Sequence, residues 1–147
     1  EYNDVKAASM LMIMSQTFFR KRRGDNIQTK EFVGHHLARH PIWKDLMFWE
    51  LVFLHHVRQE VRRNIASFSE SKAETLYHYR QIVFGQLGSI SLNMICFGMG
   101  LDAAQSLISK MCIANGLSEE ERNTLIGIAE EQVAVHEKEQ IALTEQR

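Results

Sequence analysis

The sequence QIVFGQLGSISLNMICFGMGL at residues 81–101 contains no charged side chain, and it decides the fold class. It is long enough to cross a bilayer, which takes about 20 predominantly apolar residues. However, Gln81, Gln86 and Asn93 are polar, and interior glycines lower its hydrophobicity further. A central helix that other helices surround explains this composition better. The small residues at 85 and 88 would let those helices approach closely, at a cost of about 1 kcal/mol per interior glycine.

Helical signals flank this stretch on both sides. Residues 71–74 and 118–121 each read S-x-x-E, the capping box that opens a helix. Pro41 suits the first turn of a helix, Gly116 suits the end of one, and residues 24–26 (Gly-Asp-Asn) form a turn signal. The expected helices are 4–21, 29–39, 42–64, 71 to 98 or 100, 102–115 and 118–147. We therefore predict an all-α fold without strands, a compact bundle of about six helices around a glycine-containing, uncharged central helix.

Length and composition indicate one domain. The 147 residues include only one proline, and the apolar fraction of 45% is typical of a globular protein. Since the chain begins at Glu1 without a signal peptide, we expect residues 1–147 to be a single domain excised from a longer protein. Cys96 and Cys112 have apolar neighbours, which favours buried, reduced thiols and a cytoplasmic location.

The sequence carries no catalytic or metal-binding signature. It contains no GxSxG, P-loop, GxGxxG, HExxH or Glu-x-x-His motif, so we expect no enzyme activity, no cofactor and no metal site. The seven histidines leave a helical metal protein as an alternative, which metal analysis of the purified protein would test. The net charge of −1 is far from the strong basicity of nucleic-acid binders, so no nucleic-acid partner is expected.

Two groups of residues are candidates for partner binding. An exposed aromatic patch would bind protein partners through residues that share the segment after Pro41, namely Trp43, Phe48, Trp49 and Phe53. Two basic clusters would bind anionic lipid head groups, or would simply be solvated helix ends: Arg20, Lys21, Arg22 and Arg23, with Arg58 and Arg62. The methionines, such as Met10, Met12 and Met14, either fill the core or line a groove for a partner helix.

Several segments resemble the SBF domain, the middle region of the SET-binding-factor, myotubularin-related pseudophosphatases. The segments are FGQLGS at 84–89 with NM at 93–94 and FG at 97–98, GLSEEE at 116–121, AASMLM at 7–12, and PIWKDLMFW at 41–49. The resemblance implies a non-catalytic helical module in proteins of Rab-linked vesicle traffic, with no catalytic residue to transfer. The SBF domain also occurs in stand-alone cytoplasmic proteins. We therefore expect a protein partner such as a small GTPase, and peripheral contact with endosomal or vesicle membranes. The alternative is a phosphoinositide-binding surface. The oligomeric state stays open.

Overall fold

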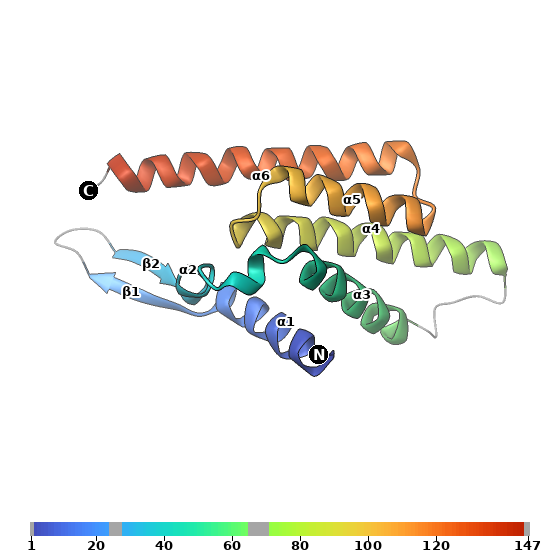
Figure 1. Cartoon of the computed structure of the whole chain (residues 1–147), viewed down its shortest axis with the longest axis horizontal. Coiled ribbons are helices and arrows are strands. Elements are labelled where there is room, and N and C mark those ends of the chain that lie inside the picture. The colour runs from blue at the N-terminus through green and yellow to red at the C-terminus, as the bar shows by residue number, and fades with distance from the viewer. Residues whose placement is uncertain (1, 24–27, 65–70, 146–147) are drawn as a thin grey trace.

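The computed structural model describes residues 2–23, 28–64 and 71–145. The expected all-α bundle is confirmed, because every buried apolar side chain among the described residues lies on a helix except that of Phe97, which follows the helix ending at Cys96. Figure 1 shows α6, α5 and α4 stacked above α3 and α1, with a small hairpin projecting beside α2. The elements in these ranges are α1 (Tyr2–Thr17), β1 (Phe19–Arg23), β2 (Gln28–Phe32), α2 (Val33–Leu37), the 3-10 helix η1 (Pro41–Lys44), α3 (Leu46–Arg63), α4 (Lys72–Cys96), α5 (Leu101–Asn115) and α6 (Glu119–Glu145).

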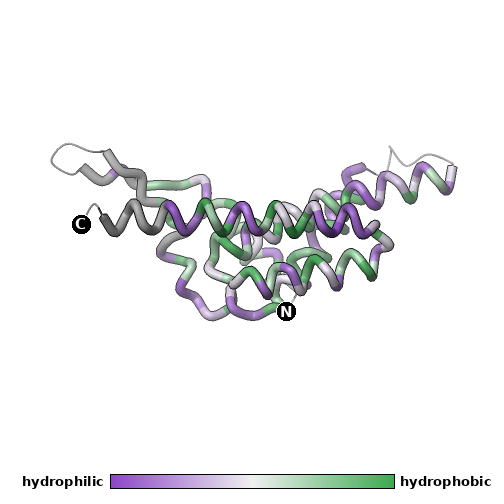
Figure 2. The backbone as a smooth tube through the Cα atoms, turned by 90° about the horizontal axis from the view of Figure 1, so that it is seen from above, coloured by the Kyte–Doolittle hydropathy of each residue, from purple (hydrophilic) through white to green (hydrophobic). Residues whose placement is uncertain are grey.

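The uncharged stretch forms the central helix, as predicted. α4 packs against α3, α5 and α6. Its residues Val83, Leu87, Ile90 and Met94 are fully buried, and they follow one another at helical spacing. Hydrophilic and hydrophobic residues alternate along α6 in Figure 2, as expected for a helix with one side on the core and one side in solvent.

The two interior glycines of α4 have different surroundings, and this yields a prediction. A Cβ atom at Gly88 would lie 3.5 Å from Leu125 Cδ2 on α6, whereas a Cβ at Gly85 would meet nothing within 4 Å. Gly88→Leu should therefore overpack the α4–α6 contact and lower the free energy of unfolding by about 1–3 kcal/mol. Gly85→Leu is the matched control and should be neutral or stabilising, because leucine is a better helix former than glycine. Urea denaturation compares the two; equal stabilities would contradict close packing at Gly88.

Helix ends follow the sequence signals in part. Ser118 and Glu121 form the expected capping box, with Ser118 N donating to Glu121 Oε2 at 2.7 Å and Glu121 N donating to Ser118 Oγ at 3.1 Å. Glu121 also pairs with Arg80 of α4 at 3.0 Å, which joins the start of α6 to the central helix. Gly116 ends α5 with a φ of 68°, as expected. Ser71 precedes α4, but its side chain makes no capping hydrogen bond to the helix.

The predicted absence of strands is wrong near the N-terminus. The helix expected over 4–21 ends at Thr17, and the helix expected over 29–39 is replaced by β2 and the short α2. β1 and β2 pair antiparallel, with Phe19 opposite Phe32 and their ring centroids 5.5 Å apart. A cross-strand aromatic pair stabilises a hairpin, and here it outweighs the helical pattern. The predicted turn at 24–26 lies outside the described residues.

Two smaller predictions also need correction. The helix expected over 42–64 is interrupted at Asp45, which ends η1 and caps α3 by accepting a 2.9 Å hydrogen bond from Met47 N. This break turns the side chain of Trp43 toward the core. Cys112 is buried as expected, but Cys96 is exposed at the end of α4.

Candidate functional site

The aromatic segment after Pro41 is a core element. Trp43, Phe48, Trp49 and Phe53 are only 2%, 5%, 0% and 1% exposed, so their expected place on an exposed protein-binding patch is corrected. The ring centroid of Trp43 lies 4.4 Å from that of Phe97 and 5.8 Å from that of Trp49. The indole nitrogen of Trp49 donates to the carbonyl of Trp43 at 2.9 Å. These residues stabilise the fold and are not available to a partner.

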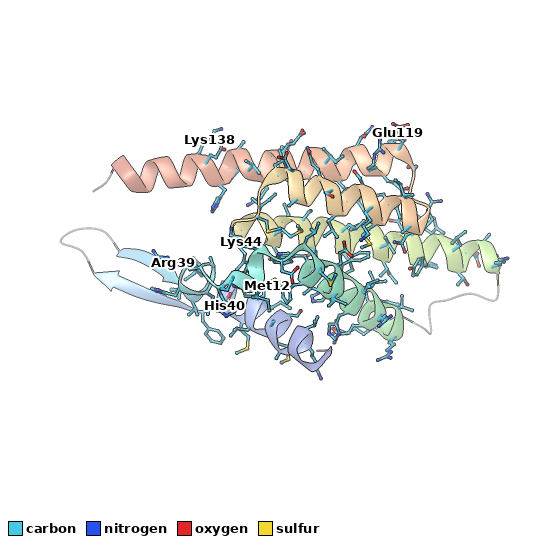
Figure 3. All side chains as sticks on the ribbon, in the orientation of Figure 1. Met12, Arg39, His40, Lys44, Glu119 and Lys138 are labelled. Atoms are coloured by element: carbon cyan, nitrogen blue, oxygen red, sulfur yellow. The ribbon has the colours of Figure 1, made fainter. Side chains whose placement is uncertain are left out.

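This aromatic cluster joins two segments that are far apart in the sequence. Besides the contact of Trp43 with Phe97, Lys44 Nζ donates to the carbonyl of Gly98 just after α4. Figure 3 shows Lys44 at the place where η1 approaches that end of α4. A cation suits the C-terminal end of a helix dipole. The segments 41–49 and 84–98 therefore form one structural unit.

Exposed apolar side chains lie elsewhere, and the largest consecutive group of them is on α1. Met10, Leu11, Ile13 and Met14 are 55%, 46%, 52% and 49% exposed, while Met12 between them is fully buried. The signal in the sequence is the run of five consecutive apolar residues at 10–14. Such a run covers every side of a helix, so a helix at the edge of a bundle must expose part of it. Met12 thus fills the core, as one of the two interpretations predicts, whereas Met10 and Met14 lie at the surface.

The two predicted basic clusters are separated in the structure. Residues 20–23 lie on β1 in the projecting hairpin, whereas Arg58 and Arg62 lie in the C-terminal half of α3, which points away from the hairpin (Figure 1). The side chains of Arg20, Arg22 and Arg23 are outside the described residues, and Lys21 is exposed. Arg58 and Arg62 are exposed and make no ion pair with another side chain that the structure describes. The six residues therefore do not form one lipid-binding surface.

A pair of histidines lies between α1 and α3. His55 is 5% exposed, and His56 hydrogen-bonds to Ser9 of α1. Burial lowers the pKa of His55, and the nearby charges of Lys6, Arg58 and Arg62 lower it further. Burial and the neighbouring His55 likewise lower the pKa of His56. Both rings therefore favour the neutral form in the folded protein.

The histidine pair predicts a loss of stability in mild acid. Unfolded histidines titrate near pH 6.5, and the folded protein binds those protons less well. The contribution of the two neutral histidines to the free energy of unfolding is therefore complete above about pH 6.5, and it is lost as the pH falls toward the lowered pKa values. Urea midpoints between pH 7.5 and 5.5 should fall for the wild type and fall less for the double variant His55→Asn, His56→Asn. Equal pH dependence in both proteins would contradict the prediction.

No metal centre is apparent within the described ranges. No group of three or more His, Cys, Asp and Glu side chains gathers there. An open depression of about 460 Å³ lies between α3 and α4, and Glu60, His78 and Gln86 are among its lining residues. Glu60 already accepts from Asn64 at 2.7 Å and pairs with Arg63 at 3.5 Å. None of the described helices combines the length and hydropathy that a bilayer span requires.

Comparison with known proteins shows the family of the chain. A family model described as "SBF2: Myotubularin protein" matches residues 1–146. The chain belongs to this SBF2 family. The resemblance expected from the aromatic segment and the central helix is thereby confirmed, and the structure shows these motifs of the SBF2 domain to be packing motifs.

One curated protein is similar in sequence to this chain. The human protein named "Uncharacterized protein KIAA0513" is 28% identical over 123 residues, which cover 71% of this chain and 29% of that protein. The chain thus spans less than a third of that relative's length. No solved structure matches the chain.

Proposed function

We propose that this SBF2 domain is a non-catalytic protein-interaction module that acts in membrane or vesicle traffic, in regulation linked to small GTPases of the Rab type. The observation that carries the proposal is the exposed apolar surface of α1, where four large side chains are each about half exposed. Surfaces of this kind mark interaction sites in soluble proteins. Membership of the myotubularin-related SBF2 family supports the trafficking context. In this proposal the domain works in the cytoplasm and at the surface of vesicles.

A panel of purified Rab GTPases tests this proposal. Each GTPase, loaded with GDP or with a non-hydrolysable GTP analogue, is presented to the immobilised domain. We expect at least one to bind in one nucleotide state more tightly than in the other. Met10→Ser with Met14→Ser should weaken that complex, while Leu76→Ser, which changes an equally exposed residue on α4, should not. Absence of any nucleotide-dependent binding would contradict the Rab link.

The non-catalytic part of the proposal has its own test. The domain should neither accelerate nucleotide release from a bound GTPase nor release phosphate from phosphoinositides. Nucleotide exchange followed with a fluorescent guanine nucleotide, and phosphate release measured on short-chain phosphoinositides, check the two activities. Turnover that scales with the amount of domain in either assay would overturn this part.

One observation favours binding to an anionic membrane surface as the second candidate function. β1 has the sequence FRKRR, the hairpin projects from the bundle, and Phe18 at its base is 57% exposed. Basic residues next to an exposed aromatic side chain suit a membrane interface. Co-sedimentation with phosphoinositide vesicles should then occur at low salt and weaken at high salt. The variant Lys21→Glu should lower it, while Arg58→Glu on the distant part of α3 should not.

A further inference from the structure

The outward side of α1 carries a stripe that changes character along its length. Lys6, Met10 and Ile13 are spaced i, i+4 and i+7, so they share one side of the helix. All three are exposed, the two apolar side chains by 55% and 52%. The stripe is basic toward the N-terminus of α1 and apolar toward its C-terminus.

A second stripe on α3 changes character in the opposite order. Leu51, Arg58 and Arg62 are spaced i, i+7 and i+11 and share one side of α3. Leu51 is 42% exposed. Both arginines are exposed without an ion-pair partner among the described residues. This stripe is apolar near the start of α3 and basic near its end.

α1 and α3 are antiparallel neighbours (Figure 1). The basic ends of the two stripes therefore lie side by side, and so do their apolar ends. Lys6 from α1, and Arg58 and Arg62 from α3, all lie close enough to His55 to act on its charge. Ser9, one turn beyond Lys6, contacts His56 on the next position of α3. Met10 and Ile13 therefore continue from the basic end toward Leu51. Three cations without an ion-pair partner among the described side chains lie at one end of this α1–α3 face, and three exposed apolar side chains lie at the other.

We propose that the α1–α3 face, formed by Lys6, Met10, Ile13, Leu51, Arg58 and Arg62, binds an amphipathic helix of a partner protein that carries apolar residues in one half and a cluster of acidic residues in the other. The proposal rests on the interaction function proposed above and names the chemistry of the partner. Charge complementarity carries it, since carboxylates would pair with cations that have no partner in the described ranges. Apolar residues at i, i+3 or i+4 and i+7 would cover Met10, Ile13 and Leu51.

A linear ligand fits this face better than a lipid surface. In a membrane-binding helix the basic residues flank the apolar side along its length, so that both reach the head-group region together. Here the basic and apolar parts follow one another along the two helices. A helix with an apolar half and an acidic half matches that order.

The test is a selection from a phage-displayed library of helical peptides with randomised surface positions, using the whole chain as bait. We expect enriched peptides to carry the apolar spacing in one half and Asp or Glu in the other. Fluorescence polarisation of a selected peptide should show about tenfold weaker binding with Arg58→Glu plus Arg62→Glu, and about tenfold with Met10→Ser plus Leu51→Ser. Lys138→Glu and Leu76→Ser are the matched controls, an exposed cation on α6 (Figure 3) and an exposed apolar residue on α4.

Three outcomes would overturn the proposal. One is a selection that enriches no peptide or peptides without acidic residues. Another is equal weakening by the control variants. A third is binding of anionic vesicles that requires Arg58 and Arg62, which would assign the face to lipid. Failure of the GTPase panel alone would remove the Rab link and leave this face intact, whereas failure of the peptide selection alone would remove the face and leave the Rab link.

Discussion

Trp49→Ala is expected to lower the free energy of unfolding by about 3–5 kcal/mol, the usual cost of truncating a buried aromatic side chain. Trp49 is fully buried in contact with three other rings, with its centroid 5.5 Å from Phe48, 5.8 Å from Trp43 and 6.3 Å from Phe97. Its indole nitrogen also satisfies the Trp43 carbonyl. The truncation leaves a cavity between η1, α3 and the end of α4. Because small domains have only about 5–15 kcal/mol of stability, the change removes a large part of it.

Met47→Ala is the matched control for this prediction. Met47 lies two residues from Trp49 on the same helix, but it is 68% exposed, so its truncation should change the stability by no more than about 0.5 kcal/mol. Urea denaturation followed by circular dichroism measures both variants. A Trp49→Ala protein as stable as Met47→Ala would show that the aromatic cluster does not hold the two segments together.

The central helix could be predicted from the sequence because its evidence is local. An uncharged, largely apolar segment of this length needs other helices to pack against, whatever they are, and α4 packs against three helices. The capping box at Ser118 and Glu121 is equally local, since both partners of its hydrogen bonds lie within one turn. Signals of this kind need no knowledge of the tertiary fold.

The candidate site was less predictable because its evidence is not local. On the continuous helix expected over 42–64, Trp43 and Trp49 at i and i+6 would lie on different sides. They meet because the helix is interrupted at Asp45, and their burial also depends on Phe97, which is distant in the sequence. The hairpin likewise depends on the pairing of Phe19 with Phe32, which a helix-period pattern does not reveal. Consequently the aromatic residues expected at the surface are core residues, and the exposed apolar surface lies on α1.

Met12→Asp is expected to release α1 from the bundle. Met12 is fully buried where α1 meets the rest of the structure (Figure 3). An aspartate there would bury a carboxylate in apolar surroundings, which costs at least about 3 kcal/mol when no cation pairs with it. α1 packs against α3, α2 and β2, and it lies at the edge of the molecule. Its local detachment therefore avoids the penalty while the packing of α4 with α5 and α6 is kept.

Hydrogen exchange distinguishes this local release from global unfolding. In Met12→Asp the amides of α1 should lose their protection while those of α4, α5 and α6 keep most of it. Ile13→Asp is the matched control, because Ile13 is the next residue and is 52% exposed. That variant should keep α1 protected, and it should still weaken the selected acidic peptide because Ile13 belongs to the α1–α3 face. Full protection of α1 in Met12→Asp would show that α1 does not depend on burial of Met12. Loss of protection in Ile13→Asp would show that the outward side of α1 is needed for folding, which would leave it unavailable to a partner.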